Sequence, residues 1–236
     1  MINDLVKIKE IIKRAYNVKS FRVEADNLDF KAGQLLLVKL EADPQLKRYL
    51  SISSSPTEKC YLEFTKKLTE SDFSKALDNL KAGQEVTIQY PLGNFVLDES
   101  FPKIAFLSGG IGITPIRSIC RYVVDTFGGV QNQSLGAGKE NSPLSINPEQ
   151  AADLSPDGRT IDKNLVKDIV LVYANRSVRD VVFKDDFDAM VKNYPALKVA
   201  HVLCETEPGF KCSVGRINAG VIKNEIPDYQ ERKIYL

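Results

Sequence analysis

A glycine-rich turn between an apolar run and an amphipathic segment constrains this chain more than any other feature. Residues 104–107 are apolar, and three glycines follow within residues 109–112. Thr114 and Pro115 come next, and these residue types favour the N-cap and the first position of a helix. The sequence therefore predicts a buried strand, a tight turn and a helix that Thr114 caps.

The segment after the turn has one apolar face. Its apolar residues recur at helical spacing: Ile116, Ile119, Cys120, Val123, Val124 and Phe127. We expect a helix with this face buried, and Cys120 as a buried thiol. Glycines let a ligand approach the backbone, and the free N–H groups of a helix start attract phosphate, but one helix end contributes only ~0.3–1 kcal/mol. Taken alone, the turn is equally well explained as a connection without a ligand.

The composition limits the function classes that remain. The 236 residues include 32 basic and 31 acidic side chains, and this balance gives no indication of a nucleic-acid or membrane-surface partner. No apolar run of about 18 residues is present, and residues 1–10 lack the apolar core of a secretion signal. The sequence therefore predicts a cytoplasmic protein without a membrane span. The four cysteines form no CxxC pair, so neither a metal site nor a disulfide is expected.

The first hundred residues have the pattern of an antiparallel barrel or sandwich. Short apolar segments alternate with turn residues, at 5–14, 18–25, 34–40, 48–53, 60–66 and 85–90. One helix, at about 74–80, interrupts them. A Pro and Gly turn at 91–95 closes this half, and residues 98–102 form the linker, so we expect domains at 1–99 and 100–236.

Two segments of this half have the side chains to bind an anion. RYLSISSSP, residues 48–56, places Arg48 beside several hydroxyls, and a charged hydrogen bond to phosphate contributes roughly 1.5–3 kcal/mol. FTKKLTESDFS, residues 64–74, places Lys66 and Lys67 ahead of the helix expected near Ser74. The simpler alternative for residues 48–56 is a serine-rich loop without a ligand. For Lys66 and Lys67 it is a pair of exposed surface lysines, and this alternative is favoured over an anion site when the two lysines are considered alone.

From residue 104 onward the pattern changes to alternating strands and helices. Strands are expected at 104–107, 168–173, 198–203 and 232–236, and a helical stripe runs from Phe183 to Tyr194. This order predicts a parallel sheet with helices on both faces, which binds ligands at the carboxyl ends of its strands. Residues 128–165 are polar and rich in Gly, Ser, Asn and Pro, so we expect a flexible insertion there; partner docking is the alternative.

In this order, the motifs RYLSISSSP, PLGNF, GGIGITP and YANRS resemble the ferredoxin–NADP reductase superfamily. The resemblance implies a flavin-binding β-barrel followed by a Rossmann-like NAD(P)-binding α/β domain. It also implies that Arg48 contacts the flavin pyrophosphate and that Ser51 lies near flavin N5. Phe64, Thr65, Lys66 and Ser74 correspond to residues that hold the ribityl and phosphate part. Tyr49 and Leu50 occupy the flavin-stacking segment, but the family has an aromatic residue at the position of Leu50.

The resemblance also assigns residues to the nicotinamide nucleotide. The loop under the nucleotide consists of Gly109, Gly110, Ile111, Gly112, Ile113, Thr114 and Pro115, with Thr114 close to the nicotinamide. Asn175 and Arg176 correspond to positions near the adenosine ribose. From its own chemistry, Glu205 at the end of the third parallel strand accepts from a ribose 2′-OH and repels a 2′-phosphate, which favours NADH; Arg176 leaves NADPH open.

The predicted function is a flavin-dependent NAD(P)H oxidoreductase that passes electrons to a separate protein or small molecule. FAD is the expected flavin, with FMN as the less favoured choice. Hydride transfer needs little acid–base help from the protein, which fits a chain whose one histidine, His201, lies in an apolar strand. The family follows its last strand with a Cys-Gly-Pro segment, whereas this sequence ends at Leu236. The alternative is therefore a flavin-carrying electron-transfer subunit with impaired nicotinamide binding.

Overall fold

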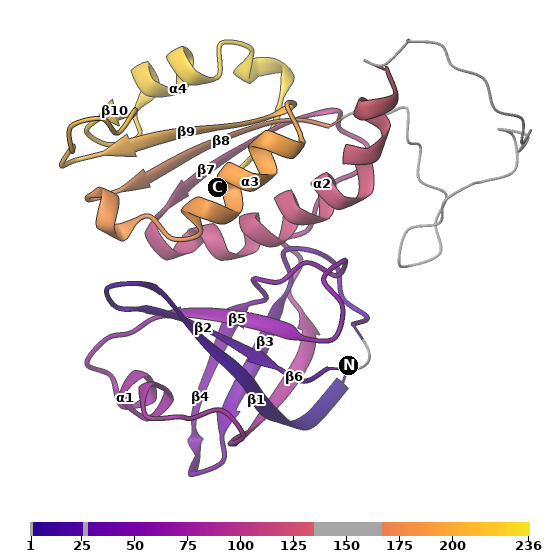
Figure 1. Cartoon of the computed structure of the whole chain (residues 1–236), viewed down its shortest axis with the longest axis vertical. Helices are drawn as coiled ribbons and strands as arrows, with labels where there is room; N and C mark the ends of the chain where they lie inside the picture. The colour runs from indigo at the N-terminus through magenta and orange to yellow at the C-terminus, as the bar shows by residue number, and fades with distance from the viewer. Residues whose placement is uncertain (1, 26–27, 135–166) are drawn as a thin grey trace, which may run out of the picture.

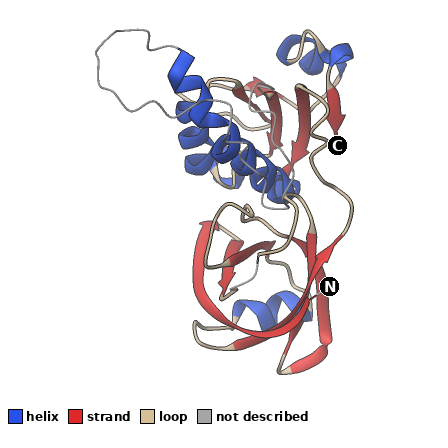
Figure 2. Ribbon diagram, turned by 90° about the vertical axis from the view of Figure 1, so that its right-hand side faces the viewer, coloured by secondary structure: helices blue, strands red, loops and turns tan. Residues whose placement is uncertain are grey.

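In a computed structural model, which describes residues 2–25, 28–134 and 167–236, the chain forms two lobes. The lower lobe in Figure 1 is a β-barrel, and the upper lobe is a parallel sheet covered by helices. Figure 2 shows that the helices on one face of the sheet lie between the sheet and the barrel. This is the predicted two-domain architecture, a β-barrel followed by a Rossmann-like α/β domain.

In the described part of the first lobe, the barrel is an antiparallel sheet of six strands. They are β1 (Ile2–Ala15), β2 (Val18–Val23), β3 (Leu35–Leu40), β4 (Asp43–Ser51), β5 (Leu62–Lys67) and β6 (Glu85–Leu92). Their order is β4-β3-β6-β1-β2-β5, and a bridge between Ile52 and Phe64 joins the two ends of this order. The stacked rings of Phe21 and Phe64, whose centroids are 5.3 Å apart, lie in the buried interior. Because alternate residues of each strand face inward, the sheet closes around one apolar core.

The helix of the barrel lobe, α1 (Asp72–Asp78), begins two residues earlier than the sequence predicted. Ser71 is its N-cap, and its hydroxyl accepts from the backbone N–H of Ser74. Ser74 therefore lies in the first turn of the helix instead of at its start. The early start follows from this cap, since Ser is a favourable N-cap and Asp a favourable first-turn residue.

Among the described residues, the second lobe has five parallel strands in the order β10-β9-β8-β7-β11. They are β7 (Lys103–Gly109), β8 (Asp168–Asn175), β9 (Leu197–Leu203), β10 (Ser213–Val214) and β11 (Lys233–Tyr235). Helices α2 (Ile113–Ser134) and α3 (Lys184–Asn193) cover the face towards the barrel, and α4 (Ala219–Glu225) covers the other face (Figure 1). Short 3-10 turns occupy Gly110–Gly112, Val178–Asp180 and Tyr229–Glu231. The sequence did not predict β10 or α4, because β10 has only two residues and α4 only seven, which is too few for a clear periodic pattern.

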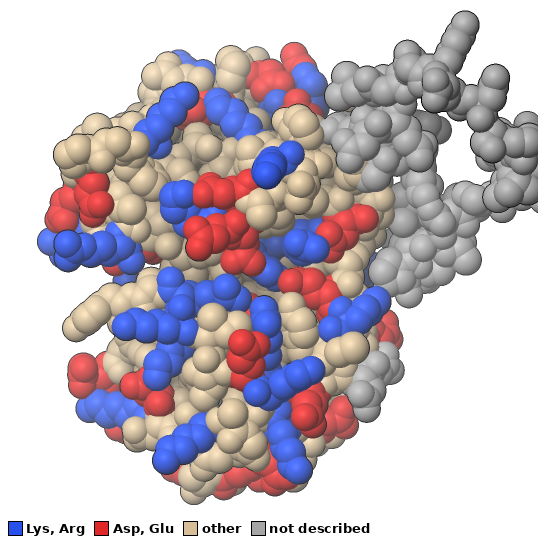
Figure 3. Space-filling model, viewed as in Figure 1, with Lys and Arg blue, Asp and Glu red and all other residues tan. Residues whose placement is uncertain are grey.

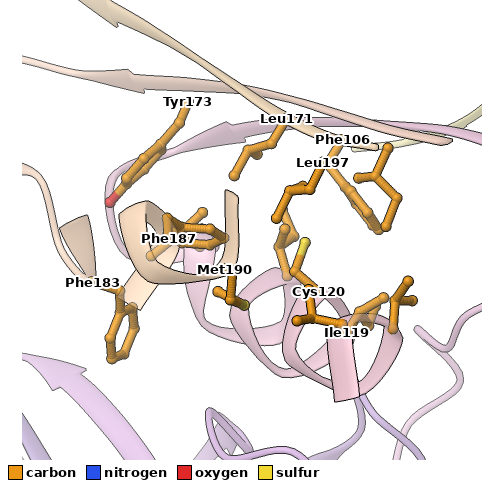
Figure 4. Close-up of a cluster of buried hydrophobic side chains, with 14 of the residues drawn as sticks. Phe106, Ile119, Cys120, Leu171, Tyr173, Phe183, Phe187, Met190 and Leu197 are labelled. Carbon is orange, nitrogen blue, oxygen red and sulfur yellow. The ribbon is translucent and has the colours of Figure 1, made fainter. Parts of the chain in front are cut away.

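The larger apolar core lies between the sheet and the helices α2 and α3 (Figure 4). Phe106 and Leu171 from the strands meet Ile119, Phe187 and Met190 from the helices. The predicted stripe of α2 faces this core. Cys120 is fully buried there, as predicted, and burial raises the pKa of its thiol.

Helix α2 continues to Ser134, so residues 128–134 are helical. The expected insertion at 128–165 therefore began too early. The polar composition of residues 128–134 gave no helical pattern in the sequence, although these residues form the last turns of α2. The remainder of that segment, 135–165, lies outside the described residues. Within the described part of the chain, no helix is both long and apolar enough to cross a membrane. The four cysteines carry free thiols.

A buried arginine of α2 connects the two lobes. The guanidinium of Arg117 donates to the carbonyl oxygen of Ser53 (3.0 Å) and to both carboxylate oxygens of Glu58, all in the segment that follows β4. The hydroxyl of Ser118 donates to the carbonyl oxygen of Ser54 at 2.6 Å. Burial by itself raises the pKa of the Glu58 carboxyl, but the hydrogen bonds and charge of Arg117 outweigh this effect and keep the pKa below its ordinary value.

We predict that Glu58→Gln lowers the free energy of unfolding by roughly 1.5–3 kcal/mol at neutral pH, the range for hydrogen bonds to charged groups. Because the folded-state pKa of Glu58 is lowered, its ionised form stabilises the fold above the unfolded pKa of about 4.3. That contribution disappears as the pH falls through the folded pKa. Urea unfolding at pH 7 and below pH 5 measures both effects. Glu24→Gln is the control because Glu24 is exposed. Equal acid sensitivity of wild type and Glu58→Gln would contradict the prediction.

Candidate functional site

The glycine turn leads from β7 into α2 through a single 3-10 turn. Gly110 has a φ of +51°, in the left-handed region that favours glycine, and a Cβ there would meet no atom within 4 Å. Open space beside a backbone in this conformation suits a closely approaching ligand. The helix begins at Ile113, so Thr114 is not the N-cap that the sequence predicted. Instead, its hydroxyl donates to the carbonyl oxygen of Ile111 at 3.1 Å. The 3-10 turn allows the helix to begin one residue before Thr114.

A pocket of about 420 Å³ lies at the carboxyl ends of the parallel strands. Its α/β wall comes from the ends of β7, β8, β9 and β10 and from the segment between β8 and α3: Gly110, Ile111, Ala174, Asn175, Arg176, Asp180, Val182, Cys204, Gly215 and Arg216. The barrel supplies the opposite wall, from the β1–β2 turn and the end of β5: Ala15, Asn17, Val18 and Lys67. The surface is hollowed between the two lobes on the left of Figure 3, where Figure 1 shows the strand ends. Four predicted residues meet here: Gly110, Ile111, Asn175 and Arg176.

Asn175 is the buried polar group of this pocket. It is 7% exposed, and its amide makes no hydrogen bond of normal geometry among the described residues, although it lies near the Tyr173 hydroxyl, where it partly offsets the rise in pKa that burial causes. A buried amide without partners is costly, whereas a ligand that both donates and accepts satisfies it. The hydroxyls of a ribose have this property.

An exposed ion pair lies beside Asn175. The Nε of Arg176 donates to Glu205 at 2.8 Å, and this hydrogen bond raises the pKa of Arg176. Glu205 does not line the pocket itself, but its backbone N–H donates to the carbonyl oxygen of Arg176, also at 2.8 Å. Glu205 therefore partly neutralises the cation next to the predicted ribose position.

Sequence reasoning missed Arg216 and Asn17 as pocket residues. Arg216 follows the two-residue strand β10, and Asn17 is in the turn of the first hairpin, so neither belonged to a motif. Lys67 was expected only as part of a second anion site with Lys66. Lys67 instead lines this pocket, while Lys66 lies near Arg48. Their separation follows from the alternation of side chains along a strand.

The other predicted residues of the loop lie around the pocket without lining it. Gly109 and Gly112 are exposed backbone positions, and Pro115 is half-buried. Ile113 and Thr114 are buried, and Ile113 packs in the core beneath α2. The side chain of Ile113 therefore supports the loop from below.

The remaining predicted residues gather at β4, β5 and α1 of the barrel. The guanidinium of Arg48 is exposed and lies 5.6 Å from the ring centroid of Phe73. Burial and the nearby charge of Arg48 both lower the pKa of the Lys66 ammonium. The hydroxyl of Ser74 lies 3.1 Å from the hydroxyls of Thr69 and Ser71. Two adjacent cations and a group of hydroxyls fit a pyrophosphate, because an anion there relieves the repulsion between the cations.

Four other residues that the sequence assigned to the flavin lie on β4 and β5 in different environments. Phe64 packs in the barrel core, whereas the buried hydroxyl of Thr65 is on the opposite face of β5, 2.7 Å from that of Ser20. They can therefore present only backbone atoms to a ligand. Leu50 packs partly against the barrel core, whereas Tyr49 is 66% exposed. The exposed aromatic ring of β4 is thus one residue earlier than the family pattern has it.

Ser51 ends β4, two residues before Ser53. Ser53 accepts from Arg117, which is one helical turn after Thr114 on α2. The predicted flavin segment and the glycine loop are therefore held together by the same interface. His201, in contrast, does not line the pocket and lies between Phe210 and Tyr173, with ring centroids 5.1 and 6.0 Å away. Burial lowers its pKa.

Two family descriptions match the chain. The oxidoreductase FAD-binding domain matches residues 5–97, and the oxidoreductase NAD-binding domain matches residues 106–236. The glycine betaine monooxygenase reductase subunit of Chromohalobacter salexigens is 28% identical over 98% of this chain and 55% of its own length. A 3-ketosteroid-9-alpha-monooxygenase ferredoxin reductase component from Mycolicibacterium smegmatis is 26% identical over 89% of this chain and 52% of its own length. The chain thus spans about half the length of these relatives.

Solved structures share the fold. The ferredoxin reductase of carbazole 1,9a-dioxygenase superposes with a TM-score of 0.71 at 19% identity, over 100% of this chain and 60% of that one. The cytochrome b5 reductase domain of Ulva prolifera nitrate reductase superposes with a TM-score of 0.69 at 18% identity, over 95% of this chain and 82% of that one. Together with the FAD-binding and NAD-binding matches, these similarities place the chain in the ferredoxin–NADP reductase-like superfamily of FAD- and NAD-binding oxidoreductases.

Proposed function

We propose that this protein is an FAD-dependent NAD(P)H oxidoreductase that passes electrons to a separate acceptor. The main support is the pocket at the ends of the parallel strands. Its opposite wall consists of residues of the FAD-binding domain. A nucleotide held by the glycine loop therefore lies against the domain that holds the flavin. The bound cofactors supply the hydride chemistry, and the protein supplies binding, orientation and exclusion of water.

On the flavin side, Arg48, Lys66 and Ser74 bind the phosphate groups. This assignment is supported by the two adjacent cations and by the group of hydroxyls around Ser74. Ser51 presents its hydroxyl near flavin N5. Tyr49 is the aromatic side chain that β4 exposes, and it covers the flavin in place of the residue expected at Leu50. Phe64 and Thr65 contribute backbone groups.

On the nucleotide side, the loop Gly109–Pro115 receives the nicotinamide half, with Thr114 nearest the ring. Asn175 binds a ribose through its buried amide. Arg216 and Lys67, one from each lobe, flank the pocket and bind the phosphates. No general base is required for this transfer, and the position of His201 outside the pocket is consistent with that.

The acceptor that we propose is a separate oxygenase component or electron-transfer protein. The support comes from the relatives, whose names describe a reductase subunit and a ferredoxin reductase component of monooxygenases. A small-molecule acceptor is the second candidate, because another relative is described as a coenzyme Q6 reductase.

The proposal predicts that the protein, reconstituted with FAD and kept anaerobic, loses its flavin absorbance at ~450 nm after one equivalent of NADH. The measurement is stopped-flow absorbance. A protein that takes up no flavin contradicts the proposal. A yellow protein that is not reduced by NADH or NADPH also contradicts it and leaves the flavin-carrying subunit as the explanation.

Arg48→Gln is predicted to weaken FAD binding about 10- to 100-fold, because it removes a charged hydrogen bond worth roughly 1.5–3 kcal/mol. Titration of the apoprotein with FAD, followed by flavin fluorescence, gives the dissociation constant. Lys47→Gln is the matched control: it is the exposed neighbour on β4 and removes the same charge. If Arg48→Gln and Lys47→Gln weaken FAD binding equally, Arg48 does not bind the pyrophosphate specifically.

We further propose that NADH is preferred, because Glu205 partly neutralises Arg176 beside the ribose position. Glu205→Gln is predicted to raise kcat/KM for NADPH relative to NADH roughly tenfold, since it leaves Arg176 available for a charged hydrogen bond to the 2′-phosphate. Steady-state kinetics with both nucleotides measures the ratio. Glu207→Gln, a nearby exposed carboxylate, is the control. An unchanged ratio would show that Glu205 does not select the nucleotide.

A further inference from the structure

One carboxylate at the boundary of the lobes is shared by two arginines. Asp186 is in the first turn of α3. Its Oδ1 accepts from the Nη2 of Arg117 at 2.7 Å, and its Oδ2 accepts from the Nη1 of Arg14 at 3.4 Å. Arg14 belongs to β1 of the barrel and Arg117 to α2. The contact with Arg14 therefore links α3 directly to the barrel, whereas the contact with Arg117 joins α3 to α2 within the α/β lobe.

Each arginine is also anchored in the barrel. Arg14 donates to the buried carboxylate of Glu63 at 3.0 Å and to the hydroxyl of Ser20 at 2.9 Å. Arg117 holds Glu58 and the carbonyl oxygen of Ser53. The side chains of Arg14 and Arg117 are only 15% and 4% exposed. Water therefore screens these charges weakly, and their geometry is well defined.

The ring of Phe183 lies close to both guanidiniums. The guanidinium carbon of Arg14 is 4.9 Å from the ring centroid, and that of Arg117 is 5.6 Å from it. The residue is 3% exposed and has a φ of 62°, a left-handed backbone that phenylalanine rarely adopts. In Figure 4 its ring points away from Phe187 and Met190, towards the barrel. The first turn of α3 thus directs an aromatic ring and a carboxylate at the other lobe.

The same network reaches both predicted reaction partners. Arg117 is one turn after Thr114, at the start of the helix that carries the glycine loop. Ser53, which Arg117 holds, is two residues after Ser51. Figure 3 shows acidic side chains of the upper lobe facing basic side chains of the barrel along this boundary. A shift of the lobes therefore changes the position of the glycine loop relative to the end of β4.

We propose that Asp186, Arg14 and Arg117 are positioning residues that set the distance between the nicotinamide and the flavin. This inference rests on the proposed function. Hydride transfer requires the reacting atoms to be about 3–3.5 Å apart, and a misplacement of about 1 Å costs on the order of 100-fold in rate. None of the three residues lines the nucleotide pocket, so we expect a larger effect on the rate than on nucleotide affinity, which changes only as far as the two walls of the pocket shift.

The test compares Asp186→Asn with Asp185→Asn in the FAD-loaded protein. Asp185 precedes Asp186 in the same helical turn and is exposed, so its variant loses the same charge without breaking the link. We expect Asp186→Asn to lower the rate of flavin reduction at saturating NADH roughly 10- to 100-fold. The NADH concentration at half-maximal rate changes much less than the rate does, and the amount of bound FAD stays unchanged. Asp185→Asn behaves as wild type.

Hydrogen–deuterium exchange provides a readout that does not depend on activity. In Asp186→Asn, exchange is expected to accelerate at 53–58, 113–118 and 183–187 while the rest of the barrel keeps its wild-type rates. Acceleration throughout the chain overturns the inference, because it indicates a general loss of stability. An unchanged reduction rate also overturns it.

A double-mutant cycle tests whether the two lobes act through this contact. Arg14→Gln and Asp186→Asn are expected to slow flavin reduction by similar factors, and the double variant by little more than either one. Fully additive effects overturn the inference. If wild type and Asp185→Asn are themselves not reduced by NADH, the proposed function fails instead, and the exchange data still decide whether Asp186 couples the lobes.

Discussion

The guanidinium of Arg117 lies almost fully buried between the two lobes, so its charge has to be compensated where it stands. Glu58 from the barrel and Asp186 from α3 provide that compensation, and the carbonyl oxygen of Ser53 accepts a further hydrogen bond. Removing one partner from a buried pair is strongly unfavourable. The requirement to keep these partners together therefore links the flavin segment, the glycine loop and α3.

The proposed nucleotide pocket depends on this link because neither lobe forms it alone. The parallel strands supply Gly110, Asn175 and Arg216, whereas the barrel supplies Asn17 and Lys67. Parallel sheets bind ligands beyond the carboxyl ends of their strands, where helix starts and loops converge. Here the barrel covers that edge. Under the proposed function, a nucleotide in the pocket is held by one domain and faces the other, as transfer between two bound cofactors requires.

Most of the fold could be predicted because its signals are local. The alternation in the first hundred residues predicted the barrel, and the stripe from Ile116 to Phe127 predicted the buried face of α2. Errors occurred where several local signals competed. Thr114 has the chemistry of an N-cap, but the 3-10 turn before it starts the helix earlier, and Ser71 caps α1 ahead of Ser74.

The candidate site was only partly visible in the sequence. Gly110, Ile111, Asn175 and Arg176 belong to motifs, and the structure brings them together in one pocket. Arg216 follows a strand of two residues, which is too short for any periodic signal.

By itself, the sequence determined the order of the two domains, the glycine turn and the residue types around it, because backbone conformation and side-chain periodicity depend on near neighbours. Only the tertiary structure decided which distant charges meet. Arg14 and Asp186 are 172 positions apart, and Arg176 and Glu205 are 29 apart. Such pairs form when strands and helices pack, since burial makes each charge dependent on whichever partner the fold places beside it.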